Sequence, residues 1–218
     1  MAVALIKARR IQEELRKRVI LKDSVPGDIK IVAGTDVAFR GDLAVSCCVV
    51  VDYMTLEPLE IKTAISHVTF PYIPTFLSFR EAKPILKAIS QLESEPDVIM
   101  FDGQGIAHPL RLGIASHVGV LLDKPTIGVA KSRLVGSYES VPDKVGDYTL
   151  LKDGEDIIGA VLRTKRNCKP LFVSPGHKIS LETSIRVVMR TVSGHKLPEP
   201  LRLAHQHANM AKSHLIEK

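Results

Sequence analysis

The apolar residues of this chain change their spacing along the sequence, and the changes predict where helices and strands lie. Residues 2–22 carry apolar side chains three or four positions apart with Arg and Lys between them, which is typical of an amphipathic helix whose buried face consists of Leu5, Ala8, Ile11, Leu15 and Val19. The segments 29–39, 43–53 and 57–70 are rich in β-branched and other apolar residues and predict three strands. Because only short turns separate them, we expect an antiparallel meander.

Helices and short apolar runs alternate in the middle of the chain. The spacing predicts a helix over 75–92, in which Pro84 either introduces a kink or marks a restart. The four apolar residues 98–101 predict a strand that is buried on both faces. A helix over 111–122 and a second buried strand over 126–130 follow.

The last third of the chain predicts a hairpin of strands at 148–152 and 156–163, a short strand at 171–173, and helices at about 180–192 and 199–216. The element order is three meander strands, then helix, strand, helix and strand. This order predicts an α/β fold of the RNase H-like type, in which helices flank a central mixed five-stranded sheet. We expect a single domain over residues 1–218, since a chain of this length buries a substantial core.

The charge and the cysteine content indicate the kind of binding partner and the cellular compartment. Thirty Lys and Arg residues against 24 Asp and Glu residues give a net charge of +6, which favours a polyanionic partner. The sequence contains no apolar run of about 18 residues, so we expect no membrane-spanning helix, and no signal peptide is evident. Cys47 and Cys48 lie inside an apolar run and, with Cys168, predict reduced thiols in a cytoplasmic protein.

Candidate chemistry begins where the strand over 98–101 ends. Asp102 follows this strand directly, and Gln104 and His108 come within the next six residues. Open α/β sheets bind ligands at the carboxyl ends of their strands, so this position favours a site. An ordinary Asp–Gly turn is the alternative explanation. The density of Asp, Gln and His after a core strand favours the site.

A second acid interrupts an apolar strand. Asp36 lies within the strand over 29–39, where an unpaired carboxylate is costly. Either a cation or hydrogen-bond donors satisfy it, or the strand lies at a sheet edge, and the sequence leaves these possibilities open. Arg80 and Glu81, taken alone, have the pattern of a surface charge pair.

A loop with two prolines precedes the helix over 75–92. Pro71 and Pro74 stiffen the backbone around Tyr72 and Ile73. Such a loop either packs its aromatic residue on the core or forms a stiff finger that enters a partner.

Eight short blocks, in this order and spacing, closely resemble the endonuclease V family, whose members nick strands near deaminated adenine. The resemblance covers about residues 30–205. The blocks are Pro71-Tyr72-Ile73-Pro74, Phe79-Arg80-Glu81, Phe101-Asp102-Gly103-Gln104-Gly105, Ala107-His108-Pro109, Arg111-Leu112-Gly113, Ala115-Ser116-His117, Pro125-Thr126-Ile127-Gly128-Val129-Ala130-Lys131 and Leu197-Pro198-Glu199-Pro200.

The resemblance implies an enzyme that recognises hypoxanthine and hydrolyses the second phosphodiester bond on its 3′ side, leaving a 3′-hydroxyl and a 5′-phosphate. It implies a divalent metal, Mg²⁺ with Mn²⁺ as a substitute. The expected partner is DNA that contains deoxyinosine, with inosine-containing RNA as a further candidate. We expect a monomer that binds no membrane.

The resemblance also assigns roles to charged residues. Asp36, Glu81 and Asp102 match the metal-binding acids, and carboxylate oxygens suit Mg²⁺ or Mn²⁺. His205 matches a fourth position, which is Asp or His among relatives, and would assist a second metal or shuttle a proton. Lys131 would neutralise charge that develops on the phosphate.

The proline loop matches the family's wedge. Tyr72, held by Pro71, Ile73 and Pro74, would stack in place of an extruded base. Position 75 departs from the family, because it is Thr here and Gly in many relatives.

The glycine-rich segment matches the base pocket. Gly103, Gly105 and Gly113 would let the backbone approach a flipped hypoxanthine, with His108 among the residues that bind the substrate.

Two other functions fit parts of the pattern. Another RNase H-like nuclease, such as a resolvase or a UvrC-type incision domain, would use the same metal chemistry, but it needs no wedge or base pocket. A non-catalytic inosine-binding module gives no reason to gather buried acids.

Overall fold

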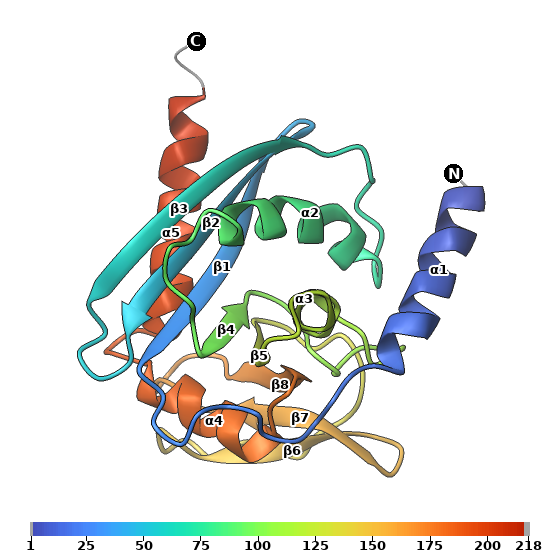
Figure 1. The fold of residues 1–218 in the computed structure, drawn as a ribbon. Helices are drawn as coiled ribbons and strands as arrows, with labels where there is room; N and C mark the ends of the chain where they lie inside the picture. The colour runs from blue at the N-terminus through green and yellow to red at the C-terminus, as the bar shows by residue number, and fades with distance from the viewer. Residues whose placement is uncertain (1, 216–218) are drawn as a thin grey trace.

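The computed structural model describes residues 2–215 and contains one eight-stranded sheet with helices on both faces (Figure 1). The strands are β1 (Ile31–Arg40), β2 (Leu43–Asp52), β3 (Pro58–His67), β4 (Val98–Phe101), β5 (Thr126–Ala130), β6 (Tyr148–Asp153), β7 (Asp156–Leu162) and β8 (Leu171–His177). The helices are α1 (Ala2–Arg16), α2 (Leu77–Ile89), α3 (Ile114–Leu122), α4 (Leu181–Arg190) and α5 (Glu199–His214).

The sheet has the strand order β3-β2-β1-β4-β5-β8-β7-β6. Strands β1, β2 and β3 form the predicted antiparallel meander, and β1, β4 and β5 pair in parallel. The predicted α/β class with a mixed central sheet is therefore confirmed. The predicted number of five strands is too low, because β8 pairs with β5 and with β7 and so adds the predicted hairpin to the same sheet.

Helices α1 and α3 are shorter than predicted. The first ends at Arg16 instead of residue 22, because the backbone of Ile20 bonds to the Nδ1 of His177 and to the N–H of Lys178 at the end of β8. The helix predicted from residue 111 begins at Ile114, because Arg111 has a positive φ of 56°, which is not a right-handed helical conformation.

Two further helix boundaries concern a proline and the C-terminus. Helix α2 runs through Pro84 without a restart, although it spans residues 77–89 and not the predicted 75–92. Helix α5 is described as far as His214, and the predicted end at residue 216 lies outside the described residues.

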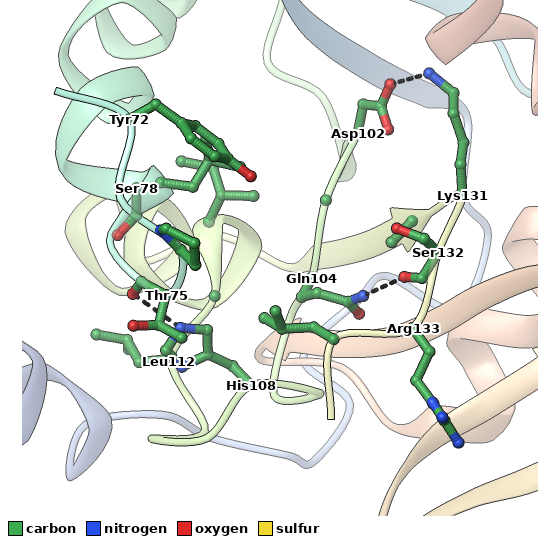
Figure 2. Close-up of a pocket in the computed structure, with 17 residues that line it drawn as sticks. Tyr72, Thr75, Ser78, Asp102, Gln104, His108, Leu112, Lys131, Ser132 and Arg133 are labelled. Atoms are coloured by element: carbon green, nitrogen blue, oxygen red, sulfur yellow. Dashed lines mark hydrogen bonds and ion pairs between the residues drawn. The ribbon is translucent and has the colours of Figure 1, made fainter. Parts of the chain in front are cut away.

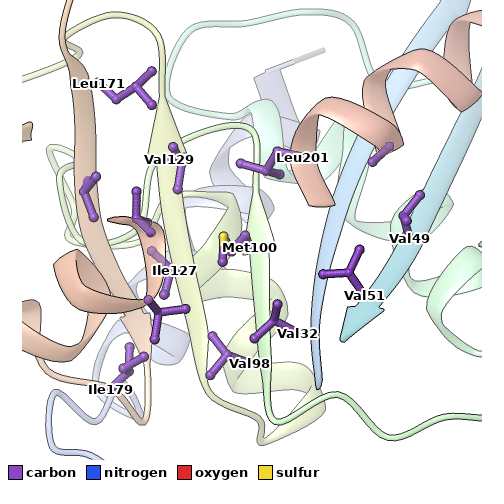
Figure 3. Packing of buried hydrophobic residues seen from close by; sticks show 14 of the residues in the cluster. Val32, Val49, Val51, Val98, Met100, Ile127, Val129, Leu171, Ile179 and Leu201 are labelled. Carbon is purple, nitrogen blue, oxygen red and sulfur yellow. The ribbon is translucent and has the colours of Figure 1, made fainter. Parts of the chain in front are cut away.

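The core lies on both faces of the sheet, and strand β4 contributes to each. Val98 and Met100 pack with Leu201 of α5 in one layer, shown in Figure 3. Ile99 and Phe101 pack in the other layer, against α2 and α3. All four residues of β4 are buried, as their apolar run predicts.

The three cysteines are free thiols, as predicted, with Cys47 and Cys48 buried in β2 and Cys168 partly exposed. Among the helices of residues 2–215, none has the length and apolar character needed to cross a membrane.

Helix α5 rests directly on β1 at a glycine. A Cβ atom added to Gly34 would lie 2.4 Å from the backbone carbon of Pro200, at the start of α5. Only a residue without a side chain lets the helix approach this closely. The contact matters for function because β1 carries Asp36 and α5 carries His205.

We expect Gly34→Ala to push α5 away from the sheet. Overpacking against backbone destabilises by about 2 kcal/mol, which lowers the melting temperature of a domain of this size by about 4–8 °C. Thermal unfolding followed by circular dichroism measures the shift. Gly27→Ala is the matched control, since a Cβ there would meet nothing within 4 Å. Equal melting temperatures for the two variants would contradict this account of the contact.

Candidate active site

Asp36 and Asp102 lie side by side on neighbouring parallel strands. Thr35 of β1 is in register with Phe101 of β4, and each acid is the next residue along its strand. Strand β1 is paired with β2 on one side and β4 on the other, so the explanation of Asp36 as a residue of an edge strand is wrong. Two carboxylates are thus held at one end of the central strand pair.

His205 supplies a hydrogen-bond donor to Asp36. Its Nδ1 lies 2.7 Å from Oδ2 of Asp36, and Asn209 approaches Nε2 of the same ring at 3.3 Å from the next turn of α5. Because a carboxylate only accepts, the proton sits on Nδ1. His214, by contrast, bonds to the Met210 carbonyl of its own helix.

Glu81 approaches from the other face of the sheet, on α2. It is no surface ion pair, because Arg80 donates instead to the Phe70 carbonyl at 2.6 Å and stacks over the Phe39 ring. Burial, with the negative charges of Asp36 and Asp102, raises the pKa of Glu81 to about 8. The three acids are therefore close enough to repel one another.

Burial and the charge of Asp102 also raise the pKa of Asp36, against the hydrogen bond from His205. Asp102 has a positively charged neighbour, because Nζ of Lys131 forms an ion pair with its Oδ2. Lys131 comes directly after β5, the next strand in the sheet. Three acids, a lysine and a histidine thus meet at one place, and they come from β1, α2, α5 and the residues directly after β4 and β5.

The donor set fits a divalent cation. Among residues 2–215, no three His, Cys, Asp or Glu side chains are already placed to hold one metal ion together. Mg²⁺ does not require such a cage, because it is usually bound by one or two carboxylates with water and substrate phosphates. Hard oxygen ligands and the raised pKa values of Asp36 and Glu81 both favour a cation here.

A cavity of about 330 Å³ opens beside the acids and shares Asp102 and Lys131 with them (Figure 2). Its lining consists of Tyr72, Pro74, Thr75, Leu77, Ser78, Asp102, Gly103, Gln104, His108, Leu112, Gly113, Ile114, Ala130, Lys131, Ser132, Arg133 and Leu134. In Figure 2, Tyr72 and Thr75 lie on one side, and Gln104 and Ser132 lie on the other.

Gln104 is a cavity residue that the sequence noted only as a polar neighbour of Asp102. Its Nε2 donates to the Ser132 carbonyl at 3.0 Å, while its buried Oε1 has no hydrogen-bond partner among the described residues. A buried acceptor without a partner favours the binding of a ligand that can donate a hydrogen bond to it. Ser132, Arg133 and Leu134 were also missed, because exposed residues after a strand carry no pattern of their own.

The proline loop borders the cavity. Tyr72 is 69% exposed, so the interpretation of this tyrosine as a core residue is wrong. Pro74 belongs to the cavity lining, whereas Pro71 and Ile73 do not. Thr75 has a φ of +71°, a left-handed conformation that favours glycine, which is the residue that the family resemblance leads one to expect here.

His108 lines the cavity and ties two loops together. Its Nε2 donates to the Thr75 carbonyl at 3.0 Å, and its Nδ1 accepts from the N–H of Leu110 at 3.1 Å. Burial lowers the pKa of His108 to about 4, so the ring is neutral when it makes these contacts. It therefore acts as a donor and acceptor, not as a charge.

The three predicted glycines have different surroundings. Gly103 and Gly113 line the cavity, whereas Gly105 lies behind it. A Cβ on Gly105 would stand 2.1 Å from the Pro175 carbonyl oxygen, and one on Gly113 would stand 2.2 Å from that of Gln104. Both Gly105 and Gly113 thus let backbone segments cross closely, Gly113 in the cavity lining and Gly105 outside it.

The mixed sheet with helices on both faces, and acids gathered where the parallel pairing of β1 with β4 ends, define an RNase H-like nuclease domain. The chain belongs to the endonuclease V family, because the sequence profile of that family, described as Endonuclease V, matches residues 13–206. It is therefore a DNA-cleaving hydrolase, and enzymes of this family depend on a metal.

Individual relatives agree with this membership. An endonuclease V from Dictyoglomus turgidum is 47% identical over 208 residues, covering 95% of this chain and 91% of the relative. The crystal structure of endonuclease V from Streptomyces avermitilis is 40% identical, with a TM-score of 0.90 over 96% of this chain and 93% of that one. An endonuclease V from Ciona intestinalis, in complex with a 23mer DNA containing an inosine followed by a ribo-adenosine, is 28% identical, with a TM-score of 0.87 over 99% of both chains.

The raised pKa of Glu81 predicts that this residue destabilises the metal-free protein at neutral and alkaline pH. The folded state holds the proton up to about pH 8, whereas an unfolded Glu releases it near pH 4.5. Stability contributed by the protonated form is thus present below pH 4.5 and is lost as pH rises through 8.

We expect Glu81→Gln to remove this loss and to be more stable than wild type at pH 8.5 by roughly 3–5 kcal/mol in the presence of EDTA. Urea unfolding at pH 5 and pH 8.5 measures the difference, which should shrink at the lower pH. Glu155→Gln, at an exposed turn, is the control and should change neither value. A Glu81→Gln protein that is less stable than wild type at pH 8.5 contradicts the assignment.

Proposed function

We propose that this chain recognises hypoxanthine in DNA and, with a divalent metal, hydrolyses the second phosphodiester bond on the 3′ side of that base. One observation carries the proposal: the acid cluster and the cavity share Asp102 and Lys131. A base held in the cavity therefore lies beside the groups that carry out hydrolysis. The inosine-containing DNA in the Ciona intestinalis complex supports the choice of substrate.

Gln104 offers a way to distinguish hypoxanthine from adenine. Hypoxanthine carries a hydrogen on N1, whereas N1 of adenine is an acceptor. The buried Oε1 of Gln104 has no partner in the described chain and would accept from that N1–H. Adenine would leave two acceptors facing each other, and a site with an unpaired buried polar group rejects such an analogue.

Hydrolysis adds water to the phosphorus atom and breaks the bond between phosphorus and O3′. The phosphate stays on the 5′ oxygen of the downstream nucleotide, and O3′ leaves as a hydroxyl after it receives a proton. Asp36, Glu81 and Asp102 would hold Mg²⁺, with Mn²⁺ as a substitute, and the cation would activate water and offset negative charge.

The remaining charged residues assist around that centre. Lys131, paired with Asp102, places positive charge where the phosphate gains negative charge. His205 orients Asp36 through its hydrogen bond and is half exposed, so it is placed to move a proton between the site and solvent.

Tyr72 would act as the wedge. Its side chain is exposed on a loop stiffened by Pro71 and Pro74 and lies at the cavity rim (Figure 2). A tyrosine that stacks in place of the extruded base offsets part of the unstacking that base flipping requires. We propose that the enzyme acts as a monomer and that inosine-containing RNA enters the same cavity.

Asp102→Asn is expected to abolish nicking while binding survives. The change keeps the shape of the side chain but removes a charge at the metal site, so the rate should fall by at least roughly 10²–10³-fold. End-labelled duplexes with one deoxyinosine or one deoxyadenosine, incubated with Mg²⁺ or EDTA, report the rate and map the nick. Asp28→Asn, at an exposed position, is the control. Full nicking by Asp102→Asn, or an equal rate on deoxyadenosine, would refute the proposal.

Tyr72→Ala is expected to weaken binding to an inosine-containing duplex by about 5–150-fold, because stacking on an aromatic side chain contributes roughly 1–3 kcal/mol. The loss should be smaller on single strands, where less unstacking is required. The melting temperature should stay at the wild-type value, since the side chain is exposed. Tyr148→Ala, at an exposed position on β6, serves as the control. An unstable variant with an unchanged duplex-to-single-strand ratio would exclude the wedge.

A further inference from the structure

The segment over residues 70–76, here called the wedge loop, is anchored at both ends by side chains from other elements. At its start, Arg80 of α2 donates to the Phe70 carbonyl at 2.6 Å. Near its end, the Thr75 carbonyl accepts from Nε2 of His108 at 3.0 Å and from Nε2 of Gln12 at 2.8 Å. The last contact joins the wedge loop to the N-terminal helix, 63 residues away in sequence.

Gln12 occupies a position on α1 where the helix pattern calls for an apolar residue. The periodicity of the sequence puts Ile11 on the buried face, yet Ile11 is 36% exposed and Gln12 is fully buried. Ala8 and Leu15, one turn away in each direction, are the other buried residues of this face. An amide side chain has thus taken the most buried position of the helix.

The amide is poorly satisfied there. Nε2 donates to Thr75, but Oε1 of Gln12 is buried without a hydrogen-bond partner among residues 2–215. A buried acceptor without a partner offsets the gain from one hydrogen bond, so an apolar residue of the same length would stabilise the fold about as well. Stability alone gives no reason for glutamine at this position.

The carbonyl that Gln12 holds belongs to a strained residue. Thr75 adopts φ +71°, and a non-glycine residue keeps such a conformation only where its surroundings over-determine it. Two donors from two different elements fix its carbonyl. Three residues earlier, Tyr72 projects from the same loop at the cavity rim.

We propose that Gln12 is a positioning residue that, together with His108, locks the wedge loop through the Thr75 carbonyl and so sets the place of Tyr72 before DNA binds. This inference rests on the proposed function. Gln12 is the better probe of the lock, because His108 also lines the cavity, whereas Gln12 does not. A loop that is already rigid loses less conformational entropy when its tyrosine enters a base stack. The hydrogen bonds to the Thr75 carbonyl should therefore raise the affinity for duplex DNA.

The test is Gln12→Met, which keeps the side-chain length and removes both the donor and the unpartnered acceptor. We expect duplex affinity for deoxyinosine to fall by about 5–10-fold, a part of the full stacking contribution of Tyr72. Affinity for the single strand should stay within about twofold, and the melting temperature within about 4 °C. Fluorescence anisotropy with Ca²⁺ in place of Mg²⁺, on both oligonucleotides, measures the affinities.

A double-mutant cycle identifies the route of the effect. If Gln12 acts through Tyr72, Gln12→Met combined with Tyr72→Ala binds the duplex no more weakly than Tyr72→Ala alone. Gln12→Leu is a second variant that cannot donate to the Thr75 carbonyl, and it should behave like Gln12→Met. Gln91→Met, at an exposed position, is the matched control and should bind like wild type.

Equal losses on duplex and single strand, or additive effects in the cycle, would overturn the proposal and leave Gln12 a structural residue. Failure of the proposed function is distinguished by the wild-type protein itself. If wild type binds duplexes with deoxyinosine and deoxyadenosine equally, the proposed function is wrong whatever the variants do.

Discussion

Mutual repulsion among three carboxylates is the constraint on which the site depends. The parallel register of β1 and β4 puts Asp36 beside Asp102, and α2 brings Glu81 to the same place from the opposite face. The sheet holds these charges together because all four residues of β4 are buried and β1 is paired on both sides. Core packing therefore holds the acids together against their electrostatic repulsion. The contacts from Lys131 and His205 offset only part of that repulsion. Such crowding is typical of functional sites, where a bound cation takes up the excess charge.

The cavity connects recognition to this chemistry. Asp102 and Lys131 belong to both, so under the proposed function a base in the cavity and a phosphate at the acids would be positioned by the same two residues. The opposite wall is a loop, and loops are inherently more mobile than strands. Hydrogen bonds from α1, α2 and the segment around His108 restrain this loop. The N-terminal helix therefore supports the site although it contributes no residue to the cavity lining.

Much of the fold follows from local pattern, and most of the differences come from contacts that local pattern does not encode. The buried strand β4 and the partly buried acid after it are visible as an apolar run that ends in Asp102. The eight-stranded sheet is not visible, because the pairing of β8 with β5 depends on tertiary contacts. Periodicity placed Ile11 on the buried face of α1, while a hydrogen bond to Thr75 placed Gln12 there instead. Glu81 had the local pattern of a surface charge pair, and only the family resemblance indicated its role. Gln104 was missed as a cavity residue because its surroundings come from the segment after β5.

If the crowded acids bind a divalent cation, Mg²⁺ must displace the proton that Glu81 holds, so proton release on Mg²⁺ binding tests the site most directly. At pH 7 the metal-free protein should hold a proton on Glu81, whose pKa is raised to about 8 by burial and by its acidic neighbours. Calorimetric titration with Mg²⁺ in buffers of different ionisation enthalpy should therefore show about one proton released per ion bound to wild type, and almost none for Glu81→Gln. Binding of Mg²⁺ without proton release from wild type, or with the same release from Glu81→Gln, would contradict the account.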